Sequence, residues 1–126
     1  MSVPEAPLRV LCIDDDQDIL SLLELSLEHS IGADVTVSRS GAEALDLFRD
    51  GWRPDVILLD VNLGAEDGRD VAELLAANEH SRGTPLIMVS AGGPTTATGS
   101  IGYIEKPFDP MQIGEQILRQ LAATEA

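Results

Sequence analysis

Short apolar runs that alternate with amphipathic segments constrain the fold of this 126-residue chain more than any other feature. Candidate strands lie at residues 8–13, 34–38, 55–60, 85–89 and 102–105. The first run is almost continuously apolar, as in parallel strands that are covered on both faces. Because alternating strands and helices are joined by right-handed crossovers, the sequence predicts an α/β fold with a doubly wound, five-stranded parallel sheet.

Capping signals place helices between these runs. Ser40 and Glu43 have the spacing of a capping box, and Pro110 suits the first turn of the closing helix. The residues expected to cap the four helices are Asp16, Ser40, Asp67 or Gly68, and Asp109. We expect residues 1–7 to form an N-terminal tail and residues 8–126 to form one domain with its own core.

Residues 92–101 break the alternation of strands and helices. Their glycines, their proline and their β-branched threonines each oppose helix formation, and the segment has no apolar stripe to dock on a sheet. We therefore expect a loop, or at most one helical turn, between the fourth and fifth strands. The fourth helix of a regular fold of this kind is predicted to be short or absent.

The chain is strongly acidic, with eight basic and 22 acidic side chains and a net charge of -14. Proteins that bind nucleic acids neutralise phosphates with basic side chains, so we expect no direct contact with DNA or RNA. An acidic surface suits divalent cations and basic partners, but it is also an ordinary way to stay soluble.

The single cysteine, Cys12, excludes an intramolecular disulfide and fits a reducing compartment. The N-terminal residues lack the basic and apolar regions of a secretion signal. No apolar run approaches the about 20 residues that span a bilayer. We therefore expect a cytoplasmic protein with no membrane partner.

Charged residues follow three of the predicted strands. Asp14 and Asp15 come after the first strand, Asp60 ends the third, and Lys106 with Pro107 follows the fifth. Ligands of open parallel sheets bind beyond the carboxyl ends of the strands, so these side chains should converge. Carboxylate oxygens are ligands that Mg²⁺ prefers, and we predict a magnesium site formed by Asp14, Asp15 and Asp60.

Aspartate is also common in turns and helix caps, and we favour that interpretation for Asp16 and Asp18. It suits Asp60 less well, because an unpaired carboxylate at the end of an apolar strand would be desolvated without compensation. A carboxylate can attack phosphorus while a metal and a lysine balance the charge of the transferred group. The sequence therefore indicates phosphoryl chemistry with Lys106 as the lysine, and a rigid turn, compatible with a cis bond, at Pro107.

Four motifs together resemble the receiver domains of two-component response regulators. They are residues 13–16, residues 58–60 with Asp67 and Gly68, residues 89–91, and residues 103–108. The resemblance covers residues 8–126 and implies a flavodoxin-like strand order of 2-1-3-4-5. It also implies a signalling protein that is no metabolic enzyme and catalyses only its own phosphorylation and dephosphorylation.

By this resemblance, Asp60 accepts a phosphoryl group from a sensor histidine kinase or a phosphotransfer protein. Mg²⁺ would be held by Asp14, Asp15 and Asp60 together with the backbone carbonyl of Asn62. The resemblance further implies that Lys106 pairs with a phosphoryl oxygen.

Ser90 and Tyr103 match the positions that switch conformation in this family when the phosphoacceptor is modified. Without the resemblance, Ser90 would be interpreted as a strand-end hydroxyl bonded to backbone and Tyr103 as a half-buried strand aromatic. No output domain follows residue 126 of this sequence, so we expect the signal to pass to a downstream partner through protein contacts. A domain excised from a longer regulator or hybrid kinase, or an intermediate carrier in a phosphorelay, stays an open alternative.

Two departures from the family pattern affect these expectations. Gly64 stands where the family commonly has proline, which predicts a more flexible loop beside the site. The reduced fourth helix puts the family's usual symmetric dimer in doubt, so we expect a monomer or a weak dimer.

Two other functions are compatible with parts of the sequence. The chain could be an interaction module that keeps the fold without being phosphorylated. It could also be an aspartate-nucleophile phosphohydrolase, because Asp14 and Asp16 have the spacing of the haloacid dehalogenase-like nucleophile and acid. Asp18 stands where that second family has threonine or valine, and the chain leaves no room for a cap domain.

Overall fold

Five parallel strands form one sheet in the order β2-β1-β3-β6-β7. The computed structural model describes residues 6–125, so most of the predicted tail lies outside the described residues. The strands are β1 (Arg9–Ile13), β2 (Asp34–Ser38), β3 (Val56–Asp60), β6 (Leu86–Ser90) and β7 (Ser100–Glu105). This arrangement confirms the predicted 2-1-3-4-5 order.

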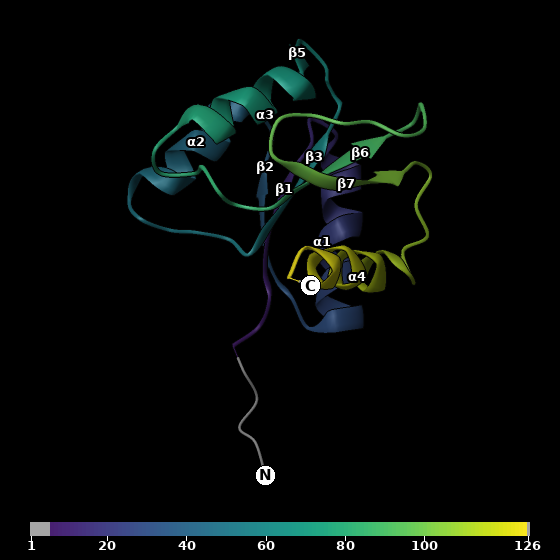
Figure 1. The fold of residues 1–126 in the computed structure, drawn as a ribbon. Coiled ribbons are helices and arrows are strands. Elements are labelled where there is room, and N and C mark those ends of the chain that lie inside the picture. Colours follow the sequence, from purple (N-terminus) through teal and green to yellow (C-terminus); the bar gives the residue numbers. More distant parts are fainter. Residues whose placement is uncertain (1–5, 126) are drawn as a thin grey trace.

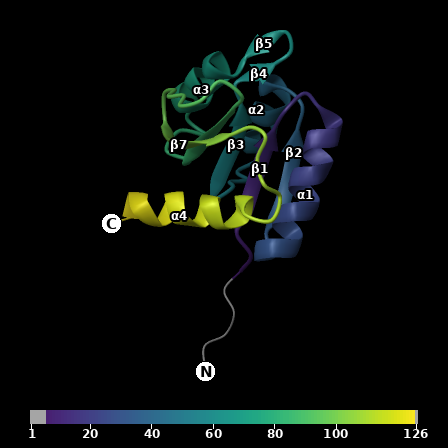
Figure 2. The same cartoon turned by 90° about the vertical axis from the view of Figure 1, so that its right-hand side faces the viewer.

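Helices cover both faces of the sheet (Figures 1 and 2). Val10 and Cys12 of β1 belong to the core that contains the buried side chains of α1 (Gln17–Ile31) and α4 (Ile113–Glu125). The alternate residues Leu11 and Ile13 pack in a second core with α2 (Gly41–Arg49) and α3 (Gly68–Ala77). Burial on both faces is why the first strand reads as a continuous apolar run.

The predicted capping residues begin three of the four helices. The side chain of Asp16 accepts hydrogen bonds from the backbone N–H groups of Asp18 and Ile19. Ser40 likewise caps α2, and Asp67 caps α3. These bonds satisfy backbone donors that have no partner within the first helical turn.

The closing helix begins later than the sequence predicts. The carboxylate of Asp109 accepts the N–H of Met111 at 2.8 Å, but helix α4 starts at Ile113. Residues 110–112 form a turn, and the Ile113 N–H donates to the Asp109 carbonyl at 3.0 Å. Asp109 therefore starts a turn that leads into the helix, which moves the boundary by about one turn.

The connection between β6 and β7 contains no helix in residues 91–99. This confirms the predicted loss of the fourth helix of the regular fold, and the whole described chain has four helices.

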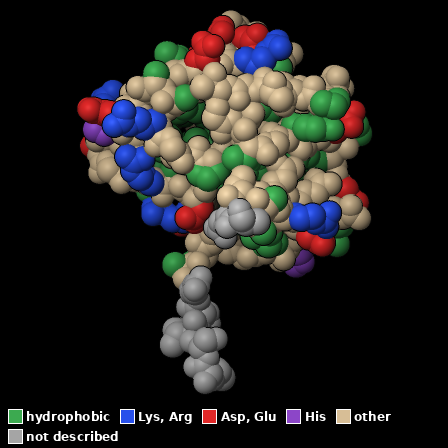
Figure 3. Space-filling model, in the orientation of Figure 1, with side chains coloured by type: hydrophobic (Ala, Val, Ile, Leu, Met, Phe, Trp, Pro, Cys, Tyr) green, Lys and Arg blue, Asp and Glu red, His purple; other side chains and the backbone are tan. Residues whose placement is uncertain are grey.

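In the space-filling view, charged side chains lie mainly around the rim of the face that carries β7 (Figure 3). None of the helices within residues 6–125 has the length and apolar character needed to cross a membrane.

A small antiparallel hairpin between β3 and α3 was not predicted. It consists of β4 (Asn62–Leu63) and β5 (Glu66–Asp67), with Asn62 paired to Asp67. Gly64 lies in its turn with φ of 73°, in the left-handed region that glycine adopts without steric cost. The hairpin fixes the path of the chain directly after Asp60.

Candidate functional site

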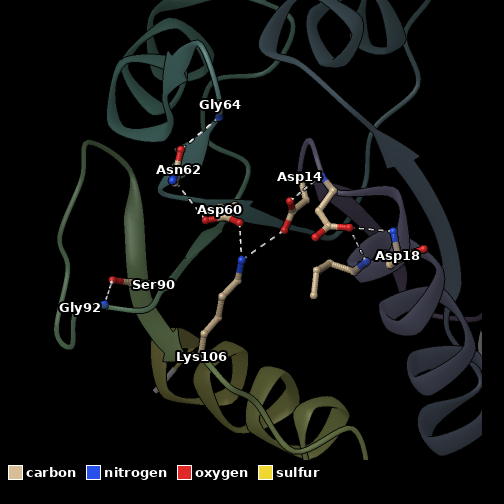
Figure 4. A network of polar contacts seen from close by, with 10 residues as sticks. Asp14, Asp18, Asp60, Asn62, Gly64, Ser90, Gly92 and Lys106 are labelled. Carbon is tan, nitrogen blue, oxygen red and sulfur yellow. Dashed lines mark hydrogen bonds and ion pairs between the residues drawn. The ribbon is translucent and has the colours of Figure 1, made fainter.

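One cleft at the carboxyl edge of the sheet collects residues from four strand ends (Figure 4). Asp14 follows β1, Asp60 ends β3, Ser90 ends β6 and Lys106 follows β7. Asp15 and Asn62 also line this cleft, together with Arg69 of α3 and Thr95 of the β6–β7 connection. The parallel sheet therefore brings together side chains that are far apart in the sequence.

Lys106 lies between two buried carboxylates. Its Nζ contacts Oδ2 of Asp60 and lies 3.5 Å from Oδ2 of Asp14. Asp60 is only 6% exposed and Asp14 only 3%. One ammonium group thus faces two acidic groups that have lost most of their contact with water.

This arrangement shifts two pKa values. Burial, and then the neighbouring Asp60, raise the pKa of Asp14 to about 7, although the Asp16 N–H and Lys106 act against the rise. Burial alone would lower the pKa of Lys106, but Asp60 and Asp14 outweigh it and hold that pKa above its ordinary value. The site therefore favours an added cation.

Backbone groups hold the other oxygen of each carboxylate. The N–H of Asn62 donates to Oδ1 of Asp60 at 2.9 Å, and the N–H of Asp16 donates to Oδ1 of Asp14 at 3.0 Å. The side chain of Asn62 is held in turn by the N–H of Gly64 at 3.1 Å. Both carboxylates are therefore fixed in place before any ligand binds.

Asp15 stands apart from this pair. It is exposed, and a Cβ atom added at Gly64 would lie 2.6 Å from its Oδ2, so the carboxylate points toward the hairpin. Among residues 6–125, no three His, Cys, Asp or Glu side chains are gathered so as to hold a metal ion. The donors nevertheless fit Mg²⁺, because hard carboxylate oxygens with excess negative charge line an open cleft that leaves room for water ligands.

Gly68 allows α3 to start against the end of β3. A Cβ atom added there would lie 2.1 Å from the backbone oxygen of Asp60, and the Gly68 N–H donates to the Val61 carbonyl at 2.6 Å. From the sequence, Gly68 was expected only as part of a motif and as a possible helix start. A glycine at the first position of a predicted helix was the available signal of a close backbone approach.

The hydroxyl of Ser90 faces the β6–β7 connection. Ser90 is 5% exposed, and its Oγ accepts the N–H of Gly92 at 3.1 Å and the hydroxyl of Thr95 at 3.0 Å. Sequence reasoning missed Thr95, and no local pattern indicated it because the contact depends on the path of the loop.

Tyr103 lies on β7 directly beside Met88 of β6. It is half-buried and packs against the core formed with α2 and α3. Its backbone carbonyl accepts a hydrogen bond from Nε2 of Gln120 in α4 at 3.0 Å. The structure thus places the ring beside the neighbouring strand and ties the backbone of β7 to the last helix.

A family model described as the response regulator receiver domain matches residues 10–118. The chain belongs to the response regulator receiver domains. Its fold is similar to that of chemotaxis response regulator CheY4 of Vibrio cholerae, with a TM-score of 0.78 and 25% identity over 91% of this chain and 99% of that one. The Francisella response regulator 1452 receiver domain gives a TM-score of 0.75 and 29% identity over 92% and 98% of the two chains.

Curated relatives place this receiver in two-component signalling. DNA-binding response regulator MtrA of Mycolicibacterium smegmatis is 32% identical over 123 residues, which cover 93% of this chain and 52% of MtrA. Transcriptional regulatory protein CpxR of Escherichia coli is 34% identical over 115 residues, which cover 86% of this chain and 47% of CpxR. The chain spans about half the length of these relatives.

The exclusion of nucleic acid from the partners is wrong, because MtrA is named a DNA-binding response regulator. That expectation rested on the net charge of -14 of this sequence. The relatives are about twice as long as the matched region. The charge of one receiver therefore does not decide whether such a regulator contacts DNA.

Proposed function

We propose that this receiver accepts a phosphoryl group on Asp60 and changes conformation in response. The donor is a phosphohistidine of a sensor histidine kinase or of a phosphotransfer protein. The observation that carries the proposal is the buried Asp60 carboxylate, which contacts Lys106 and lies beside Asp14 at the carboxyl edge of the sheet. Membership of the receiver family supports the same reaction.

In the proposed reaction, a carboxylate oxygen of Asp60 attacks phosphorus. The bond between phosphorus and the donor imidazole nitrogen breaks, and the imidazole leaves with the electron pair and takes up a proton. The ammonium group of Lys106 balances charge on the phosphoryl oxygens. The Asn62 N–H, already bonded to Asp60, keeps the carboxylate oriented during attack. The receiver catalyses only this modification and its hydrolysis.

Four groups of this chain would hold Mg²⁺: the carboxylates of Asp14, Asp15 and Asp60 and the backbone carbonyl of Asn62. When bound, Mg²⁺ neutralises negative charge on the aspartates and on the transferred group. The raised pKa of Asp14 supports this assignment, because it reflects a buried acidic pair that Lys106 balances only in part. Asp15 is exposed beside the pair and its side chain can turn toward the cleft.

The conformational change involves Ser90 and Tyr103. A phosphoryl group adds roughly two negative charges and three acceptor oxygens at one point, which the Ser90 hydroxyl can bond. As Ser90 turns, the ring of Tyr103 moves inward. A site that favours one of two conformations in this way can signal through contacts with a downstream protein.

The relatives extend the proposal to gene control. MtrA is named as DNA-binding and CpxR as a transcriptional regulator. We propose that this receiver likewise controls a DNA-binding activity. The receiver unit spans residues 8–126, acts in the cytoplasm and is a monomer or a weak dimer.

Intact-mass measurement after incubation with acetyl phosphate and Mg²⁺ tests the proposal. The wild type should gain one phosphoryl group, and so should the control Asp46→Asn, whose carboxylate is exposed on α2. Asp60→Asn and a sample without Mg²⁺ should gain none. An adduct that persists in Asp60→Asn would assign the chemistry to another residue.

A further inference from the structure

Thr95 lies in the β6–β7 connection and contacts Ser90 through their hydroxyl groups. We infer that Thr95 is a positioning residue for the switch. In the unmodified protein it holds the Ser90 hydroxyl against the β6–β7 connection by a hydrogen bond. That bond breaks when Ser90 turns toward the modified Asp60. The inference rests on the proposed phosphorylation of Asp60, and it assigns a role to a segment that the proposed function leaves unused.

The hydrogen bonds of the two hydroxyls support this role. Oγ1 of Thr95 lies 3.0 Å from Oγ of Ser90 and 3.2 Å from the carbonyl oxygen of Gly93. A hydroxyl has one proton, so Thr95 donates either to Ser90 or to Gly93. In the second case Ser90 can donate to Thr95, so the contact between the two hydroxyls is kept in both arrangements.

The N-terminal half of the connection is attached to the sheet through Ser90. Gly92 donates its N–H to the same Ser90 oxygen at 3.1 Å, on the side of the connection (Figure 4). The other end is closed by bonds between Ala97 and Ser100. Since residues 91–99 form no helix, the connection lacks the internal bonds that a helical crossover would supply. The Ser90 hydroxyl therefore fixes this half of the loop.

The position of Thr95 connects the cleft with the core. Thr95 and Ser90 line the cleft that contains Asp60 and Lys106. Ser90 can therefore exchange its bond with Thr95 for a bond with the phosphoryl group on Asp60 without leaving the cleft. Ala97, two residues further on, packs against the same core as Tyr103. Releasing the loop at Thr95 therefore frees a segment that packs against the same core as the proposed second switch residue, Tyr103.

A bond that exists only in the unmodified state opposes the change of state. Thr95→Val keeps the branched shape and removes the hydroxyl, so it should favour the switched state. A neutral hydrogen bond of ordinary net strength corresponds to an affinity change of about two- to tenfold. We expect Thr95→Val to bind a phosphoryl analogue about two- to tenfold more tightly than the wild type does.

Titration with beryllofluoride and Mg²⁺, followed by the amide NMR signals, tests this expectation. The dissociation constant should fall in Thr95→Val, and it should stay at the wild-type value in Thr95→Ser, which keeps a hydroxyl. Thr96→Val is the matched control, since Thr96 is the exposed neighbour in the same loop. In a Ser90→Ala background, Thr95→Val should have no effect on the dissociation constant, because the partner hydroxyl is gone.

Amide exchange without ligand gives a second measurement. The amides of residues 92, 93, 95 and 96, and above all that of Gly92, which donates to Ser90, should exchange faster in Thr95→Val than in the wild type or in Thr96→Val. An unchanged dissociation constant in Thr95→Val, or an equal gain in the Ser90→Ala background, would overturn the role of Thr95 while leaving Asp60 as the acceptor. A wild-type protein that binds no beryllofluoride and gains no phosphoryl group would overturn the proposed function, and this inference with it.

Discussion

At the scale of single residues, Lys106 is the cation that the two buried carboxylates share. Removing it by Lys106→Met leaves Asp14 and Asp60 without their common partner. The Lys106 side chain is 24% exposed, so its loss should cost less than the loss of a partner in a fully buried ion pair. We expect the free energy of unfolding to fall by about 1–3 kcal/mol. Urea unfolding measures this loss.

Mg²⁺ should stabilise Lys106→Met more than the wild type, because the bound ion supplies the missing positive charge and adds its binding energy to folding. Arg119→Met is a suitable control, since Arg119 forms an exposed pair with Glu115 and should lose little stability. A Lys106→Met protein with wild-type stability and no response to Mg²⁺ would show that the acidic pair needs no cation.

At the scale of elements, the β4–β5 hairpin decides where the chain goes after Asp60. Gly64 has φ of 73° in its turn, and its N–H bonds the side chain of Asn62. Proline is fixed near φ of about -65° and has no N–H. We expect Gly64→Pro to cost about 1–3 kcal/mol in urea unfolding, because the turn must rebuild and Asn62 loses a bond.

Gly64→Asn is the control for the turn, because asparagine tolerates a positive φ and keeps the N–H. Its new Cβ atom meets only the exposed Asp15 carboxylate, which can move aside. We expect it to lose less stability than Gly64→Pro. Equal stability of Gly64→Pro and the wild type would mean that the left-handed turn is dispensable.

At the scale of the whole molecule, the reactivity of the Cys12 thiol measures how often the sheet unfolds. It is fully buried in β1, between β2 and β3 and beneath α1 and α4. Burial, helped by the charges of Glu24 and Asp14, raises the pKa of its thiol, so little reactive thiolate is present at neutral pH. We expect native Cys12 to resist thiol reagents and to react in proportion to the unfolded fraction in urea.

An exposed thiol calibrates that experiment. Thr96→Cys in a Cys12→Ala background should react at once without denaturant, because Thr96 is exposed in the β6–β7 connection. Rapid labelling of native Cys12 would mean that the central strand opens locally, without global unfolding.

Most of the architecture could be predicted because it depends on local patterns. Apolar runs identify the five strands, and the resemblance to receiver domains implies the order that the sheet has. Strand ends then place Asp14, Asp60 and Lys106 in one cleft. The two-residue strands β4 and β5 have no periodicity to detect, and the start of α4 depends on the turn at Asp109.

The contact of Thr95 with Ser90 could not be predicted, because the irregular path of the loop between them follows no periodic pattern. The partner prediction failed for a different reason. Net charge describes the surface of this sequence alone, whereas the relatives extend to about twice its length.

The identity of the modified carboxylate is the most direct test of this account. Borohydride reduction of the acetyl phosphate-treated protein converts an aspartyl phosphate to an alcohol, and peptide mapping then locates the altered residue. We predict a single altered position, Asp60. Reduction at Asp14 or Asp15 instead would contradict the assignment of acceptor and metal ligands.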